Sequence, residues 1–196
     1  MNLLVLALSV VGFGAFLLLD NPQLAKWPVL RHATSMIGSL ALAVAMWSAA
    51  GSGDVLDWPR WTTGLGWMLA VIGLCLLVYS VFIEIPLTLR RHTGPGPTLV
   101  QSGTYALCRH PGVLWLVLLL VGVLLIVKRT GFVPLMILWI ILDIVVVAVQ
   151  DRIVFPRQFP GYDQYQRRTP FLVPTPASLA TFIGRNAHAT PTSEDK

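Results

Sequence analysis

The chain has 196 residues, of which 55% are apolar and 12% are charged, and its formal net charge is +5. Soluble domains carry about 25% charged residues, so this composition argues against a soluble enzyme. The apolar content argues against a disordered chain, and the presence of only two cysteines argues against a disulfide-stapled secreted module. The remaining class is an integral membrane protein.

Five apolar runs predict an all-α, polytopic membrane protein with about five transmembrane helices. The runs cover residues 3–19, 33–50, 64–83, 113–127 and 132–149. A hydrocarbon core of roughly 30 Å requires about 20 helical residues, and the fourth run is the shortest of the five. The first run lacks a basic segment before it and an A-x-A site after it, so we expect a span there and not a cleaved signal peptide.

The distribution of lysine and arginine predicts the orientation of these spans. With the N-terminus outside and the C-terminus cytoplasmic, only Arg60, Lys128 and Arg129 of the 14 basic residues lie outside. The net positive charge then requires no nucleic-acid partner, because the cytoplasmic bias and attraction to anionic lipid account for most of it.

Three regions follow from this pattern. Residues 1–99 hold the first three spans and a connecting loop, in which the turn-rich stretch 93–98 cannot be regular helix. Residues 100–176 hold the last two spans and a polar, aromatic segment. Residues 177–196 form a tail that we expect to be disordered at its end.

The last two spans are joined only by residues 128–131, which predicts an antiparallel helical hairpin. The start of the fourth span and the end of the fifth must therefore lie side by side on the cytoplasmic face. Those two places carry the polar signals of the chain, Arg109-His110-Pro111 and Gln150-Asp151-Arg152.

Each of these polar residues has a plain and a functional interpretation. Pro111 suits the first position of a helix, so the free N–H groups there, with Arg109, predict an anion site. The plain interpretation is that Arg109 and His110 are an interfacial positive pair. Asp151 either pairs with Arg109 or Arg152 or faces a bound cation. Asp143 is the clearest charge inside a span and serves either helix packing or function.

The remaining candidates lie in the tail and before the fourth span. Tyr162 and Tyr165 are three residues apart, so one face of a short helix can carry both, as interfacial anchors or as a ring wall over an adenine or a cation. Cys108 is interpreted as a small apolar residue. The sequence contains no metal-ligand spacing and no phosphate-binding glycine motif.

The segment from Ser102 to Pro111 resembles a signature of integral-membrane methyltransferases, the isoprenylcysteine carboxyl methyltransferase and phospholipid N-methyltransferase group. That signature reads G-x-Y-x-x-x-R-H-P before an apolar helix. The segment after the fifth span is similar to a second signature of this group. That signature reads as a Glu-Glu pair followed by F-x-x-Y-x-x-Y, basic residues and P-x-x-x-P. The matching residues are Gly103, Tyr105, Arg109, His110, Pro111, Phe159, Tyr162, Tyr165, Arg167, Arg168, Pro170 and Pro174. Gln150-Asp151 replaces Glu-Glu, and Val113-Leu114-Trp115 replaces the Tyr-x-Gly of many members.

The resemblance implies S-adenosylmethionine as cofactor, a lipid or small amphiphile as methyl acceptor, and no metal. The cytoplasmic tail would complete the cofactor pocket. Arg109 and the helix start at His110 suit the cofactor carboxylate, Asp151 its ammonium or sulfonium, and the tyrosines its adenine. The implied catalytic residues are His110 and Arg109, with His110 also able to take a proton from the acceptor. The implied cofactor-binding residues are Tyr105, Arg109, His110, Pro111, Gln150, Asp151, Tyr162 and Tyr165.

Three alternatives remain open. The first is a non-catalytic membrane protein of the same fold, which is favoured by Gln150-Asp151 in place of Glu-Glu and by the missing Tyr-x-Gly. The second is an NADPH-dependent membrane reductase, although the chain is short for a protein of that class. The third is a small channel or transporter, which the absence of an inverted repeat disfavours.

Overall fold

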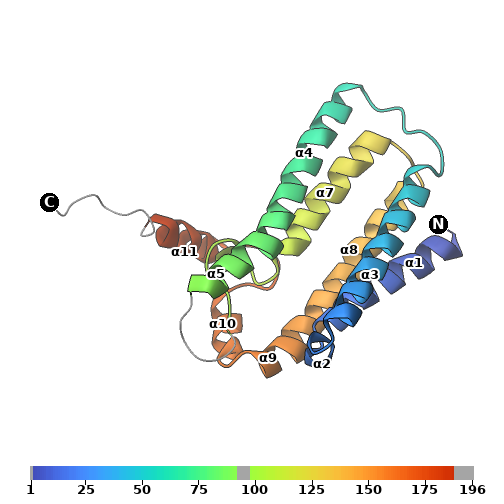
Figure 1. Cartoon of the computed structure of the whole chain (residues 1–196). Helices are drawn as coiled ribbons and strands as arrows, with labels where there is room; N and C mark the ends of the chain where they lie inside the picture. The colour runs from blue at the N-terminus through green and yellow to red at the C-terminus, as the bar shows by residue number, and fades with distance from the viewer. Residues whose placement is uncertain (1, 92–97, 188–196) are drawn as a thin grey trace. The chain divides into compact units, whose positions relative to one another are not determined.

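The structure is a computed structural model that describes residues 2–91 and 98–187. The secondary-structure elements assigned within these residues are all helices (Figure 1). The turn-rich stretch 93–98 lies outside them except for its last residue, as does the end of the tail, 188–196. In chain order the helices are α1 Leu3–Leu19, α2 Pro22–Ala25, α3 Pro28–Ala50, α4 Trp61–Val78, η1 Tyr79–Glu84, α5 Ile85–Arg91, α6 Thr104–Leu107, α7 Pro111–Val127, α8 Phe132–Val149, η2 Gln150–Val154, α9 Phe155–Gln158, α10 Tyr162–Arg168 and α11 Pro176–Ala187, with η marking π-helical segments.

Three of these helical stretches are long and apolar enough to cross a membrane: Pro28–Ala50, Trp61–Arg90 and Phe132–Gln158. The apolar helices α1 and α7 are shorter, at 17 residues each. All five apolar runs of the sequence are therefore helical, and three of them support a membrane protein. The second begins five residues earlier than predicted, because a proline at the first helical position starts α3 at Pro28.

The chain divides into two compact units, and helices α4 and α7 each contribute to both. Unit 1 comprises Met1–Gly73 and Val117–Gln150, and unit 2 comprises Leu74–Leu116 and Asp151–Lys196.

In unit 1, helices α1, α3 and α8 pack against one another (Figure 1). Their core includes a buried polar contact in which the Trp139 indole N–H donates to the Ser9 hydroxyl oxygen at 2.8 Å. The same hydroxyl donates to the Val5 carbonyl at 2.7 Å, so both of its roles are used. Phe13 packs edge-on against Trp139, with ring centroids 6.0 Å apart. Because every polar atom named here has a partner, the contact fixes how α1 meets α8 without an unsatisfied group.

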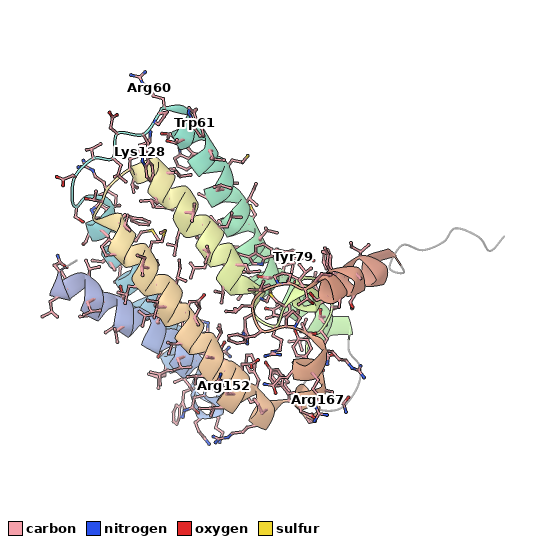
Figure 2. The ribbon with its side chains drawn as sticks, turned by 180° about the vertical axis from the view of Figure 1, so that it is seen from behind. Arg60, Trp61, Tyr79, Lys128, Arg152 and Arg167 are labelled. Carbon is pink, nitrogen blue, oxygen red and sulfur yellow. The ribbon has the colours of Figure 1, made fainter. Side chains whose placement is uncertain are left out.

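One end of unit 1 is closed by the link between α7 and α8, which is the predicted helical hairpin. Lys128 ends α7 with a φ of 51°, a left-handed conformation that often terminates helices. Its ammonium donates to the carbonyls of Trp58 and Pro59, and Figure 2 places it near Arg60 and Trp61. At the other end of α8, the Gln150 amide donates to Asp20, directly after α1, at 2.7 Å.

Unit 2 carries the end of α4, the first turns of α7 and most of the polar segments. Two π-helical segments belong to it wholly or mostly, and each bears a buried carboxylate, Glu84 on η1 and Asp151 on η2. Helix α11 packs on α6 and begins with a reciprocal cap between Thr175 and Ser178. The sequence interpretation treated this region as a tail, so α11 is an addition to the predicted elements.

Candidate functional site

The polar residues singled out from the two signatures meet in unit 2. Arg109 and His110 directly precede α7, Asp151 lies on η2, and Tyr162 and Tyr165 lie on α10. As predicted, the start of α7 and the segment that follows α8 are adjacent, and one short helix carries both tyrosines. Pro111 is the first residue of α7, also as predicted.

Asp151 is the centre of this cluster. Its carboxylate accepts two bonds from the Arg109 guanidinium, Nε to Oδ1 at 2.7 Å and Nη2 to Oδ2 at 3.1 Å. The Tyr162 hydroxyl donates to Oδ1 at 2.7 Å, and the Gln166 amide donates to Oδ2 at 3.1 Å. The side chains of Arg109 and Asp151 are only 11% and 7% exposed. The result is a buried, bidentate ion pair, the strongest class of charged hydrogen bond.

Arg109 also holds the tail. Its Nη1 donates to the carbonyls of Gln166 and Thr169, both at 2.8 Å. With the two bonds to Asp151, four of the five guanidinium N–H groups are engaged. The backbone reinforces the contact, because the N–H of Arg109 donates to the Pro170 carbonyl at 2.9 Å and that of His110 to the Phe171 carbonyl at 3.3 Å. The plain interpretation of Asp151, pairing with Arg109, is therefore present in the structure.

His110 is buried between aromatic rings. It stacks on Phe155 with ring centroids 6.0 Å apart and meets Phe171 edge-on at 5.2 Å. Its Nε2 approaches Asp151 Oδ1 at 3.4 Å. Burial lowers the pKa of His110 below its ordinary value, although the neighbouring Asp151 carboxylate acts in the opposite direction. The imidazole is therefore neutral at pH 7.

The lowered pKa of His110 makes a prediction for stability. Well above pH 6.5, the ordinary pKa of histidine, the residue is neutral in both states, so it contributes no pH dependence there. Below that pH the unfolded chain binds the proton first, so the folded state loses stability as the pH falls toward the lower pKa of the native residue. In the variant His110→Gln, the amide keeps a donor near Asp151 but does not titrate.

We expect the melting temperature of wild type to fall more steeply than that of His110→Gln between about pH 7 and pH 5. Thermal unfolding of the detergent-solubilised protein, followed by intrinsic fluorescence, measures both profiles. Carboxylates titrate in both proteins, so the difference between the profiles isolates the histidine. Parallel profiles would contradict the assignment of a buried, neutral His110.

The three tyrosines tie the segments of the cluster together. Tyr162 and Tyr165 are 2% and 4% exposed, with ring centroids 5.8 Å apart. Burial raises the pKa of Tyr105, Tyr162 and Tyr165, so their hydroxyls stay protonated and act as donors. The Tyr165 hydroxyl donates to the Tyr105 carbonyl at 2.7 Å, which joins α10 to α6. Both tail tyrosines are therefore interior residues and not surface anchors.

Two other candidate residues have different surroundings. Gln150 precedes Asp151 in sequence, but its side chain bonds Asp20 within unit 1. Cys108 is fully buried, and burial raises the pKa of its thiol to about 11. A thiol with that pKa is protonated at neutral pH and is a poor nucleophile, which fits the interpretation of Cys108 as a small apolar residue.

Sequence reasoning did not identify four further contributors: Phe155, Phe171, Gln166 and Glu84. The two phenylalanines and Gln166 carry no recognisable signal, because their role depends on how the tail folds back. Glu84 had one. It is a lone acid within the 30-residue apolar stretch Trp61–Arg90, and it is 5% exposed. Asp143, which is half-buried in α8, is therefore not the only acid within a candidate span.

No family model, curated protein or solved structure matches this chain. The resemblance to the membrane methyltransferases therefore rests only on the sequence motifs in residues 100–176.

Proposed function

We propose that the protein is an integral-membrane methyltransferase that uses S-adenosylmethionine and acts on a lipophilic or amphiphilic acceptor at the cytoplasmic interface. One observation carries the proposal: the two halves of the signature meet. Arg109 and His110, which precede α7, contact Asp151 on η2, and Tyr105 accepts a hydrogen bond from Tyr165 on α10. Residues more than 40 positions apart in the sequence thus form one cluster.

The donor set of the cluster fits the polar end of S-adenosylmethionine, which is an amino-acid zwitterion beside a sulfonium. Asp151 would hold the ammonium or the sulfonium. The remaining N–H of Arg109 and the N-terminal end of α7 would hold the carboxylate. The rings around His110, Phe155 and Phe171, offer the π surface that a cation or an adenine prefers.

The cofactor supplies an electrophilic methyl group when it is bound. Direct displacement then requires alignment and exclusion of water more than acid–base groups, and the half-buried rings of Phe155 and Phe171 around His110 serve that purpose. The approach of His110 Nε2 to Asp151 favours the tautomer with the proton on Nε2, which leaves the lone pair on Nδ1. A neutral His110 can accept a proton there from an acidic acceptor.

The proposal includes five transmembrane helices with the N-terminus outside and the C-terminus in the cytoplasm. A helix of 17 residues is about 26 Å long, so α1 and α7 nearly match a hydrocarbon core of roughly 30 Å. The bias of basic residues toward the segments that follow α1, η1 and α8 supports this orientation. Among them, Arg152 and Arg167 project outward from η2 and α10 (Figure 2).

A second candidate function is that of a non-catalytic membrane protein of the same fold. The observation that favours it is the mutual satisfaction of Arg109 and Asp151, which leaves the guanidinium one N–H to offer a ligand. In that case the ion pair serves only to fasten the tail to the start of α7.

Titration of the full-length, detergent-solubilised protein with S-adenosylhomocysteine separates these functions. We expect micromolar binding by calorimetry, weakened about tenfold or more in Arg109→Lys, because lysine keeps the charge but loses the planar fork. The control Arg157→Ala removes an exposed arginine of α9 that neither signature includes, and it should bind like wild type. Thermal unfolding of each protein confirms that it is folded.

A folded wild-type protein that binds no S-adenosylhomocysteine at roughly millimolar concentration would overturn the proposal. NADPH is then titrated in the same way. Binding of NADPH alone would favour a reductase, and binding of neither would favour the non-catalytic protein.

A further inference from the structure

Glu84 is a buried carboxylate that neither signature includes. It is the last residue of η1, and it is 5% exposed. Its two oxygens accept from a single residue 20 positions later: the backbone N–H of Thr104 donates to Oε1 at 2.8 Å, and the Thr104 hydroxyl donates to Oε2. A charged group in an apolar helix is costly unless it is satisfied, so this contact accounts for its presence.

The backbone at Gly103 is shaped to admit this carboxylate. Gly103 has a φ of 56° and a ψ of −132°, a region that is open to glycine and strained for other residues. A Cβ at this position would overlap the Glu84 carboxylate. Gly103 therefore serves both the backbone conformation and the close approach of Glu84.

Glu84 takes the place of the missing N-cap of α6. Helix α6 has only four residues, and its N-cap residue, Gly103, has no side chain to accept from the first free N–H groups. A helix this short is unstable by itself, so its end depends on an external partner. The Thr104 N–H, the first of α6, is satisfied by Glu84.

Helix α6 connects this cap to the candidate site. Tyr105 follows Thr104, and its carbonyl accepts from the Tyr165 hydroxyl. The Tyr105 hydroxyl reaches the carbonyl of Ser80, one π-helical turn before Glu84, at 3.4 Å. Tyr165 packs on Tyr162, which bonds Asp151. The cap on α6 is thus linked by consecutive contacts to the Arg109–Asp151 pair.

We propose that Glu84 is a positioning residue for the site, acting through its cap on Thr104 to fix α6 and with it the Tyr105–Tyr165 contact. The proposal rests on the proposed function in so far as the cluster is a cofactor site. Glu84 touches no part of the Arg109–Asp151 pair in this scheme, so its effect is transmitted entirely by α6.

Hydrogen–deuterium exchange of the full-length protein in detergent tests the cap without any ligand. In Glu84→Met the acceptor is lost but the apolar helix is kept, and we expect exchange in the segment 103–107 to quicken about tenfold. In Glu84→Gln the amide keeps an acceptor for the Thr104 N–H and a donor for its hydroxyl, so exchange should return close to wild type. Asp143→Asn is the matched control, because it changes another acid in an apolar helix, and it should leave the segment unchanged.

The same variants are titrated with S-adenosylhomocysteine. We expect about tenfold weaker binding in Glu84→Met and recovery in Glu84→Gln. Unchanged exchange in Glu84→Met would overturn the cap, and faster exchange with unchanged affinity would overturn the positioning role. Failure of wild type to bind would overturn the proposed function instead, while the exchange measurement would still decide the cap.

Discussion

Replacing Asp151 with alanine is expected to destabilise the protein by about 3–5 kcal/mol, the cost typical of removing one partner from a buried ion pair. The change strands the Arg109 guanidinium with two empty donors in a site where its side chain is 11% exposed. It also removes the acceptor of the Tyr162 hydroxyl. For a chain of this size the melting temperature should fall by roughly 6–20 °C, measured by thermal unfolding in detergent.

Two comparisons identify the buried pair as the cause. Asp163→Ala removes the partner of Arg167 in an exposed pair at 3.9 Å on α10, where the expected loss is about 0.5 kcal/mol or less. The double variant Arg109→Met/Asp151→Leu removes both charges together and should recover part of the loss, because no uncompensated guanidinium is left buried. The Tyr162 hydroxyl and the carbonyls of Gln166 and Thr169 still lose their partners in this variant. Equal effects of Asp151→Ala and Asp163→Ala would contradict the buried geometry.

The helices and one long-range contact could be predicted from the sequence because each depends on short-range rules. Apolar runs with at most one charged residue each predicted the five long apolar helices. The four-residue link predicted that α7 and α8 are antiparallel, so Arg109 was expected near Asp151. A proline after His110 predicted the first residue of α7, since proline is tolerated where the N–H has no helical partner.

The positions of adjacent side chains could not be predicted, because they depend on local helix geometry. Gln150 and Asp151 were treated as one signature, but successive residues of a helix point in directions about 100° apart. Each makes its contact within a different unit, Gln150 with Asp20 and Asp151 with Arg109. The π-helical segment η2 adds to this uncertainty, since a wider turn changes the phase of every residue after it.

The sequence also left open whether Arg109 serves a ligand or the fold. An arginine next to a helix start can bind a ligand anion or a carboxylate of the protein itself. Which of the two it binds depends on the acceptors that the tail supplies. Here the tail supplies two carbonyls, those of Gln166 and Thr169, in addition to Asp151. Backbone acceptors have no sequence signature, so this part of the site could come only from the structure.

Adding a single methyl group at Gly122 is expected to destabilise unit 1 by about 3 kcal/mol, near the upper end of the cost of overpacking. Gly122 lies on α7, where a Cβ would overlap the backbone of α4 at Ala70 and at Gly66. Gly66 in turn faces the Gly122 carbonyl, so each glycine admits the backbone of the other helix. Backbone atoms cannot move aside as the end of a side chain can. Gly122→Ala should therefore lower the melting temperature by roughly 6–12 °C.

The matched control is Gly14→Ala in α1, which is also an apolar helix of 17 residues. A Cβ at Gly14 meets nothing within 4 Å. Alanine is the better helix former by about 1 kcal/mol, so Gly14→Ala should be neutral or slightly stabilising. Both substitutions gain the same helix propensity, and the difference between their melting temperatures therefore measures the cost of separating α4 from α7. Equal melting temperatures would mean that the two helices do not meet at Gly66 and Gly122.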